Sequence, residues 1–209
     1  IIMNLYFYKD SIEAGIDEVA RGCLFGRVYS AAVIWPNEEN EISCHPLIKD
    51  SKKLDQRKRL MMSDFIKENA ISYSISFQGE EVIDQINILN ATFKCMHLAI
   101  DNLKIDVDNL LVDGNKFKPY ISPQGDLIPH QCIIKGDNNY FPIACASILA
   151  KVEHDQYIMD LCDQNEELNE FYDLRNNVGY GTKNHILGIQ NYGLSNFHRK
   201  TFGICKNYV

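Results

Sequence analysis

Alternating apolar and polar residues in the first part of the chain predict three β-strands. Between Ile12 and Trp35 the side chains first alternate and then run apolar and β-branched, which is typical of two strands. Gly22 and Gly26 favour a turn between these strands. Residues 71–77, ISYSISF, alternate again and predict a third strand.

Two shorter apolar runs later in the chain each end next to an aspartate. Residues 109–115, NLLVDGN, indicate a short buried strand followed by a turn, and residues 131–139, QCIIKGDNN, repeat this design. Each segment therefore places one aspartate at or just beyond the carboxyl end of a predicted strand.

The spacing of apolar residues predicts a first helix after the second strand. Asp55 can cap this helix, which ends near Ala70, because an aspartate side chain accepts hydrogen bonds from the first free backbone N–H groups. The prediction places Leu60, Met61 and Phe65 on the inner face of the helix.

A second and a third helix are predicted further along the chain. The second begins near Asn87, and its core positions recur at helical spacing: Leu89, Phe93, Met96, Ile100 and Leu103. Pro142 can open a third helix that ends near Cys162, since proline is tolerated in a first turn. The small side chains of the third helix permit close packing on a sheet: Ala144, Ala146, Ser147 and Ala150. Residues 179–202 predict a loop with two short helices, so the chain as a whole indicates a mixed sheet covered by helices.

The composition is typical of one globular domain, which we expect to span residues 1–209. The chain is 45% hydrophobic and 23% charged, which is enough for a full core. Its seven cysteines form no CxxC pair, so the sequence favours a reducing compartment over a disulfide framework or a zinc site. The apolar start IIMNLYFY lacks the basic flank of a signal peptide, and FPIACASILA is too short to span a membrane. The sequence therefore predicts a soluble, cytoplasmic protein.

The net charge of −7 argues mildly against a nucleic-acid partner, because phosphate binding usually relies on an excess of lysine and arginine. Any such binding must come from local basic patches. A chain with this charge is expected to bind phosphate weakly and with a steep dependence on salt concentration.

Four carboxylates next to apolar strand sequence are the strongest candidates for chemistry. They are Asp17 and Glu18 in GIDEVARG, Asp113 in LLVDGN and Asp137 in IIKGDNN. For one aspartate alone, a side chain that bonds its own backbone in a turn is the simpler explanation. A buried carboxylate is costly unless it is paired or binds a cation, so a set of four at one sheet edge favours a site for Mg²⁺ or Mn²⁺.

Eight short motifs follow one another along nearly the whole chain. They are GIDEVARG with Gly26, KDSKKL at 49–54, INILNAT at 86–92, LLVDGN at 110–115, IIKGD at 133–137, ASILAKVEHD at 146–155, GYGTKNH at 179–185 and FHRKTF at 197–202. In this order they resemble the successive motifs of ribonuclease HII, the type 2 ribonuclease H family. The resemblance implies an α/β protein with the ribonuclease H-like fold, a five-stranded mixed β-sheet flanked by helices. It also implies a C-terminal helical extension, from about residue 165 to 209, that binds substrate.

The resemblance further implies an activity and a cofactor. The chain is expected to be an endoribonuclease that hydrolyses the RNA strand of RNA–DNA hybrids and incises at ribonucleotides embedded in duplex DNA, in ribonucleotide excision repair and DNA replication. Asp17, Glu18, Asp113 and Asp137 are implied to bind two divalent ions, Mg²⁺ or Mn²⁺, that activate a water for in-line attack and give 5′-phosphate and 3′-hydroxyl ends. The implied partners are RNA–DNA hybrids and DNA duplexes containing ribonucleotides. No obligate protein partner and no membrane association is evident.

Selection of RNA over DNA depends on the 2′-hydroxyl group, which can donate and accept hydrogen bonds. By the resemblance, the contacts at the RNA–DNA junction come from Ala20, Arg21, Gly22 and Tyr180. Ala20 departs from the glycine that is usual in the family, and its methyl group restricts conformations with positive φ. Other implied substrate contacts are Lys49, Lys52, Lys53, Asn87, His198 and Arg199. The basic residues 57–59 fit a solvated helix face more simply.

Two alternatives of different kinds stay open. The first is another metal-dependent nuclease of the same fold, such as a type 1 ribonuclease H, because a fold does not fix a substrate. The KDSKKL segment and Tyr180 argue against it. The second is a module that binds hybrids without cutting them, and the presence of all four carboxylates gives it little support.

Overall fold

Five strands form one mixed sheet in the order β3-β2-β1-β4-β7. The computed structural model describes residues 3–37, 48 and 54–209. The strands are β1 (Glu13–Val19), β2 (Val28–Ile34), β3 (Ser72–Gln78), β4 (Asn109–Asp113) and β7 (His130–Ile133). The first three form an antiparallel meander, whereas β4 runs parallel to β1 and β7 runs parallel to β4. The predicted mixed five-stranded sheet is confirmed.

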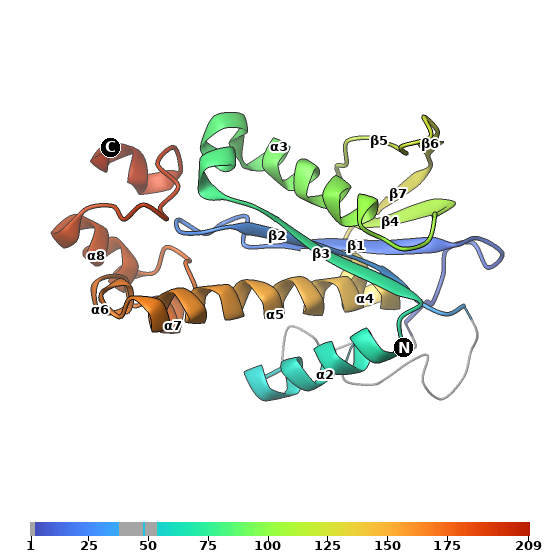
Figure 1. Ribbon diagram of the computed structural model, residues 1–209, viewed down its shortest axis with the longest axis horizontal. Coiled ribbons are helices and arrows are strands. Elements are labelled where there is room, and N and C mark those ends of the chain that lie inside the picture. Colours follow the sequence, from blue (N-terminus) through green and yellow to red (C-terminus); the bar gives the residue numbers. More distant parts are fainter. Residues whose placement is uncertain (1–2, 38–47, 49–53) are drawn as a thin grey trace.

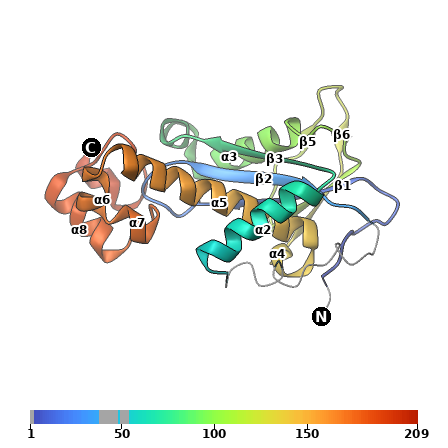
Figure 2. The same ribbon diagram turned by 60° about the horizontal axis from the view of Figure 1, so that its bottom comes forward.

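Helices cover both faces of this sheet (Figure 1). The long helix α3 (Glu80–Asp101) packs on one face, and α5 (Phe141–Gln164) packs on the other along β1 and β2. Helix α2 (Gln56–Asn69) lies on the outer side of α5, as Figure 2 shows from a second direction. A short helix, α4 (Gly136–Asn139), leads directly into α5. The predicted long helix with proline in its first turn is confirmed.

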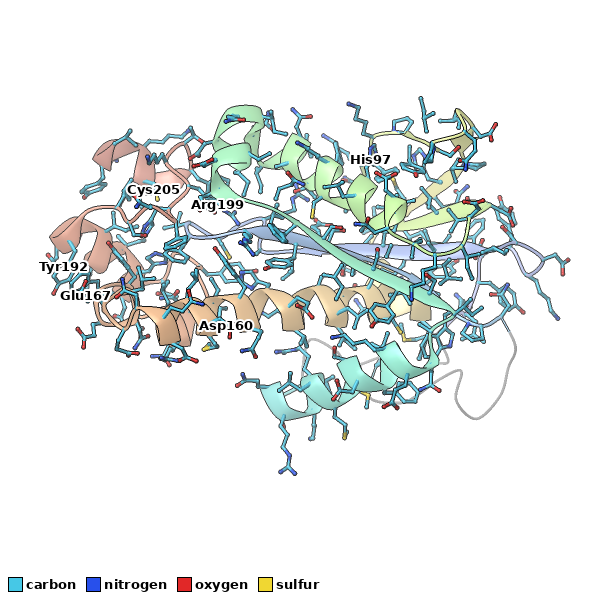
Figure 3. The ribbon with its side chains drawn as sticks, in the orientation of Figure 1. His97, Asp160, Glu167, Tyr192, Arg199 and Cys205 are labelled. Carbon is cyan, nitrogen blue, oxygen red and sulfur yellow. The ribbon has the colours of Figure 1, made fainter. Side chains whose placement is uncertain are left out.

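The C-terminal part forms a separate helical cluster at the end of the sheet where β1 passes into β2 (Figure 1). It contains α6 (Glu167–Tyr172), α7 (Leu174–Asn177), α8 (Lys183–Tyr192) and the 3₁₀ helix η2 (Gly203–Tyr208). Its core joins apolar residues of these helices to Leu24 and Phe25 of the β1–β2 connection. Figure 3 labels Arg199 and Cys205 at this junction. The cluster is therefore built around the segment that follows the first strand.

The predicted cap of the first helix is confirmed, and its predicted inner face is right at Phe65, which packs against the core, but wrong at Leu60 and Met61. Asp55 accepts a hydrogen bond from the backbone N–H of Lys58 at 2.8 Å. Leu60 and Met61 are 43% and 52% exposed, and the buried positions are Met62, Ser63 and Ile66. Three consecutive apolar residues at 60–62 span most of a helical turn, so the sequence pattern does not choose among them.

Helix α3 begins earlier than predicted and carries a break inside it. It starts at Glu80, whereas Asn87 has φ 66° and ψ 164° and interrupts the helical backbone. The Oδ1 atom of Asn87 accepts a hydrogen bond from the N–H of Asn90 at 3.1 Å. Asn87 therefore caps the second half of the helix, and a short first half precedes it.

Other departures from the sequence prediction lie near the second aspartate motif. A two-stranded ribbon, β5 (Tyr120–Ile121) with β6 (Leu127–Ile128), was not predicted. It lies between β4 and β7 in the sequence and forms a separate small sheet. Asp137 lies in α4 and not at a strand end. Among the described residues, no helix combines the length and apolar character that crossing a membrane requires.

Candidate active site

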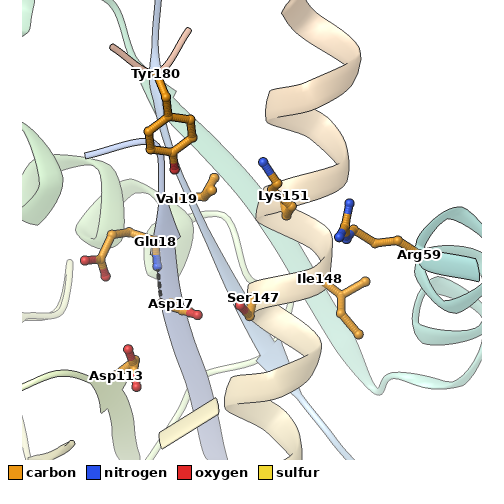
Figure 4. A pocket seen from close by; sticks show the side chains of 9 residues that line it. All are labelled: Asp17, Glu18, Val19, Arg59, Asp113, Ser147, Ile148, Lys151 and Tyr180. Atoms are coloured by element: carbon orange, nitrogen blue, oxygen red, sulfur yellow. Dashed lines mark hydrogen bonds between the residues drawn. The ribbon is translucent and has the colours of Figure 1, made fainter. Parts of the chain in front are cut away.

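A cleft of about 340 Å³ opens where β1 ends (Figure 4). Its lining comes from β1, β4, α2, α5 and the segment before α8: Asp17, Glu18, Val19, Arg59, Asp113, Ser147, Ile148, Lys151 and Tyr180. Figure 4 shows the carboxylates of Glu18 and Asp113 on one side and the cations of Lys151 and Arg59 on the other. The cleft thus sets a negative wall opposite a positive wall.

The pairing of β1 with β4 explains why distant carboxylates meet here. The two strands are parallel, and Ile16 pairs with Val112, so the next residues in each strand are Asp17 and Asp113. Asp17 is only 6% exposed, and its Oδ1 atom accepts a hydrogen bond from the N–H of Glu18 at 2.7 Å. Adjacent strands therefore bring three of the four predicted carboxylates to one cleft.

Burial and neighbouring acids raise the pKa of two carboxylates in the cleft, Asp17 and Glu18. Burial raises the pKa of Asp17 well above its usual value, and the charges of Glu18 and Asp113 raise it further, against the lowering effect of a hydrogen bond from Ser147. Burial also raises the pKa of Glu18, while Arg21 lowers it and Asp113 raises it. Such crowding of oxygen ligands fits a hard divalent cation, which stabilises the ionised form of every carboxylate at once.

Asp137 stands beside the cleft and does not line it. The N–H of Gly136 donates to Oδ1 of Asp113 at 2.6 Å, so the start of α4 touches the end of β4. Asp137 follows in α4 and is 1% exposed, and Asn138 donates to its Oδ1 at 3.2 Å. Within the ranges 3–37, 48 and 54–209, no three acidic, histidine or cysteine side chains form a ready-made metal cluster. Like charges repel one another, so closer convergence of the acids requires a cation.

Asp155 holds the two cations of the opposite wall. Its Oδ1 lies 2.8 Å from Nζ of Lys151, and its Oδ2 lies 3.8 Å from Nη1 of Arg59. Burial raises the pKa of Asp155, but hydrogen bonds from His154 and Lys151 outweigh burial and lower it. An ionised Asp155 therefore fixes Lys151 and Arg59 toward the cleft.

Cys23, His154 and Asp155 lie in the order of a nucleophile, a base and an orienting acid. Sγ of Cys23 is 4.0 Å from Nε2 of His154, and Nδ1 of His154 is 3.0 Å from Oδ1 of Asp155. Cys23 is fully buried, and burial raises the pKa of its thiol to about 12. A buried, protonated thiol is not a nucleophile, so this series packs the cleft and does not attack substrate.

The residues predicted to contact the RNA–DNA junction gather on one side of the cleft. Ala20 has φ 69°, a left-handed conformation that favours glycine. The Nη1 atom of the Arg21 side chain donates a hydrogen bond to Oε1 of Glu18 at 3.0 Å. Arg21 and Gly22 are both exposed. The ring of Tyr180 lies 5.7 Å from Nζ of Lys151 and next to Gly22, and burial raises the pKa of its hydroxyl to about 12. Arg21, Gly22 and Tyr180 thus border the acids.

The remaining predicted contacts have different placements. Asn87 is exposed at the break in α3. His198 and Arg199 are 1% and 0% exposed, so the expected direct contact with a nucleic-acid backbone does not fit their placement. A basic run at residues 198–200 resembles a surface patch in the sequence, and only tertiary packing shows that its first two side chains turn inward. Lys49, Lys52 and Lys53 lie outside the described residues.

Arg59 and Lys151 are cleft residues that the sequence prediction did not assign to the site. Arg59 was assigned to a solvated helix face, yet it lines the cleft. The sequence does contain a feature that could have predicted Lys151 in the cleft. Ser147, Lys151 and Asp155 recur every four residues and therefore share one face of α5.

Relatives of this chain are found over nearly its whole length. The family model described as Ribonuclease HII matches residues 14–205. A ribonuclease HII of Phocaeicola vulgatus is 44% identical over 200 residues, which cover 95% of this chain and 92% of that protein. A ribonuclease HII of Porphyromonas gingivalis is 40% identical over 202 residues, which cover 97% of this chain and 94% of that protein.

Solved structures share the fold. The ribonuclease H2 from Pyrococcus horikoshii OT3 has a TM-score of 0.73 at 21% identity, over 94% of this chain and 96% of that chain. The chain is also similar to the Bst-RNase HIII that was solved in complex with Mn²⁺, with a TM-score of 0.65 at 18% identity over 99% of this chain and 70% of that one. Together with the observed sheet, these similarities confirm the predicted ribonuclease H-like fold.

Proposed function

The chain belongs to the ribonuclease HII family and is an endoribonuclease, and on this premise we propose that it incises duplex DNA at embedded ribonucleotides as well as cutting RNA–DNA hybrids. We further propose a reaction that depends on two divalent cations and leaves 5′-phosphate and 3′-hydroxyl ends. The observation that carries the proposal is the cleft in which Asp17, Glu18 and Asp113 face Lys151 and Arg59. A phosphodiester is a negative group that must approach a cation site, and this cleft offers both charges.

The acidic wall is the proposed metal site. Its donors are carboxylate oxygens, the ligand type that Mg²⁺ and Mn²⁺ prefer, and burial with the neighbouring acids raises the pKa of Asp17, so a cation is needed to offset the cost of its ionised form. Asp17, Glu18, Asp113 and Asp137 would hold the cations, which supply water activation and stabilise the leaving oxygen. Ser147 would keep Asp17 oriented by its hydrogen bond. We propose that Asp137 completes the set from α4, directly behind Asp113.

The cationic wall is the proposed site for the substrate phosphate. Lys151 and Arg59 are held by one ionised carboxylate, Asp155, so they present their charges to the cleft without free rotation. Arg21 and Tyr180 border the same cleft and are proposed to contact the sugar and phosphate at the RNA–DNA junction. Lys49, Lys52, Lys53 and Asn87 remain proposed contacts to the nucleic-acid backbone. The proposed place of action is the cytoplasm, in ribonucleotide repair and DNA replication.

Digestion of a labelled DNA duplex that contains one ribonucleotide tests this function. With Mg²⁺ or Mn²⁺ we expect one cut next to the ribonucleotide, ends that carry a 5′-phosphate and a 3′-hydroxyl, and no cut in the all-DNA duplex. A uniform RNA–DNA hybrid serves as the second substrate. Cleavage of the hybrid alone would favour a type 1-like nuclease, and binding of both substrates without cleavage would favour a non-catalytic module.

A further inference from the structure

Arg199 is a fully buried cation that bonds to backbone carbonyls. Its Nε donates to the carbonyl oxygen of Gly26 at 2.8 Å, and its Nη1 donates to that of Arg21 at 3.1 Å. Its Nη2 donates to the carbonyl oxygens of Ala20 at 2.8 Å and Arg27 at 3.1 Å. The planar fork of a guanidinium can serve several acceptors in fixed directions, which one ammonium group cannot do. Arg199 therefore spans both ends of the connection between β1 and β2.

This connection, residues 20–27, turns through positive φ near both ends, and at Ala20 it needs support because only glycine adopts such a conformation readily. Ala20 has φ 69° and Gly26 has φ 76°. For an alanine this conformation is unfavourable unless the surroundings hold it. If the bond from Arg199 to the Ala20 carbonyl is lost, Ala20 can return to negative φ. That change redirects Arg21, which bonds Glu18 in the cleft.

The residues on either side of Arg199 reach two further parts of the site. The Nε2 atoms of His198 and His185 are 3.1 Å apart, and Nδ1 of His185 is 2.9 Å from the carbonyl oxygen of Tyr180. On the other side, Asp84 of α3 accepts hydrogen bonds from the N–H groups of Lys200 and Thr201, both at 2.9 Å. One short segment thus links the 20–27 connection, the backbone of Tyr180 and the first half of α3.

We propose that Arg199 is a positioning residue that sets the selectivity for an embedded ribonucleotide. It does so by holding the 20–27 connection, which keeps Arg21 against Glu18 and Gly22 next to Tyr180. It does not touch substrate, because it is buried at the junction that Figure 3 shows between the C-terminal segment and the sheet. The inference rests on the proposed function, since it concerns how the same cleft discriminates between its two proposed substrates.

The test compares Arg199→Lys with Arg175→Lys. The first change keeps the charge and loses the fork, whereas the second alters a partly exposed arginine that bonds Asp163 and Glu166 in the C-terminal cluster. Two quantities are measured: kcat and KM on the single-ribonucleotide duplex and on the uniform hybrid, and amide hydrogen exchange of residues 20–27. The N–H groups of Leu24 and Gly26 report the connection directly, because they bond the carbonyls of Gly179 and Phe197.

For Arg199→Lys we expect faster exchange in residues 20–27 and a fall of about tenfold or more in the ratio of kcat/KM between the two substrates, carried mainly by kcat. The Arg175→Lys protein should match the wild type in both measurements. A ratio within about twofold of the wild type, in a variant with faster exchange, would overturn the proposal. An unchanged exchange pattern in a folded variant would overturn it as well, because Arg199 would then not hold the connection.

A milder variant covers the case in which Arg199→Lys does not fold. Asp84→Asn weakens the anchor of Lys200 and Thr201 from the partly exposed side of α3, and we expect a smaller loss of the same ratio, about threefold. An unchanged ratio there would contradict the proposal. Failure of the wild-type protein to cut the single-ribonucleotide duplex would instead refute the proposed function, and the selectivity role of Arg199 with it.

Discussion

Gly15 lies where β1 and α5 approach closely, and Gly15→Ala should displace the strand that carries the acids. A Cβ atom at this position would lie 2.3 Å from the carbonyl carbon of Pro142 and 2.4 Å from the backbone nitrogen of Ile143. Ordinary contacts begin near 3.4 Å, so the strand and the helix must separate by about 1 Å. The clashing atoms belong to the helix backbone, so no side-chain rotation can relieve the overlap.

The expected cost is at the upper end of overpacking effects, about 3 kcal/mol. For a chain of this size that corresponds to a fall in Tm of roughly 6–12 °C. The displacement also separates Asp17, two residues further along β1, from Ser147 on α5. We therefore expect a loss of activity of about tenfold or more at temperatures where the variant is folded.

Gly79→Ala is the matched control. Gly79 precedes α3 with φ −75°, and an added Cβ meets nothing within 4 Å. Its stability should stay within about 1 kcal/mol of the wild type. Thermal and urea unfolding measure both variants, and cleavage of a uniform hybrid measures activity. A Gly15→Ala protein that melts within about 2 °C of the Gly79→Ala protein would refute the close approach inferred for β1 and α5.

Four further predictions concern the cleft and the C-terminal cluster. Asp113→Asn should reduce cleavage to near zero, because it removes a proposed metal ligand, and substantial cleavage would refute that role. It should cost no stability in the absence of metal, because the charge of Asp113 raises the pKa of Asp17 and Glu18. Treatment with a chelator should abolish cleavage until Mg²⁺ or Mn²⁺ is added back, and activity that survives chelation and dialysis would contradict the metal site. Lys151→Met should raise KM for the hybrid about tenfold, whereas Lys67→Met, which alters a partly exposed ion pair with Glu153, should not; equal KM values would remove Lys151 from the phosphate site. Burial, with the charge of His185, lowers the pKa of His198 to about 3, against about 6.5 in the unfolded chain, so the unfolded state binds more protons between these values. The resulting stability is complete above about pH 6.5 and is lost as the pH falls toward 3, and His198→Gln should flatten the fall of Tm on acidification; parallel curves would contradict this.

The sequence predicted the strands and the long helix well because local patterns determine them. Alternating or continuous apolar residues mark β1 to β3, and Pro142 with the small residues that follow marks a helix packed closely on a sheet. The inner face of α2 was predicted correctly at Phe65 but not at Leu60 and Met61, because three adjacent apolar residues at 60–62 leave the choice to packing against α5. The prediction began α3 near Asn87, which starts only its second half, and it missed residues 80–86 because an asparagine cap is itself a start signal in the sequence.

The candidate site likewise contains residues that the sequence could predict and residues that it could not. Asp17, Glu18 and Asp113 could be predicted to meet because two parallel strands with one register deliver them. The placement of Arg199 could not be predicted, since a guanidinium that bonds carbonyls of residues 20–27 depends on contacts across more than 170 positions of the sequence. A motif match identifies such an arginine, but only the fold shows whether it faces the substrate or the interior.

The distribution of charge in the fold also bears on how an acidic protein can bind a polyanion. The net charge of −7 repels nucleic acid at long range, and the acids of the cleft add to that repulsion at short range. Lys151 and Arg59 are both paired with Asp155. Each cation can attract a phosphate locally, but the carboxylate of Asp155 offsets part of their combined positive charge. On the proposed function, productive binding must then depend on cations at the acidic wall, which change the sign of the field where the phosphate enters. Binding and catalysis would draw on the same ions, so removal of the cations should weaken duplex binding as well as abolish cleavage.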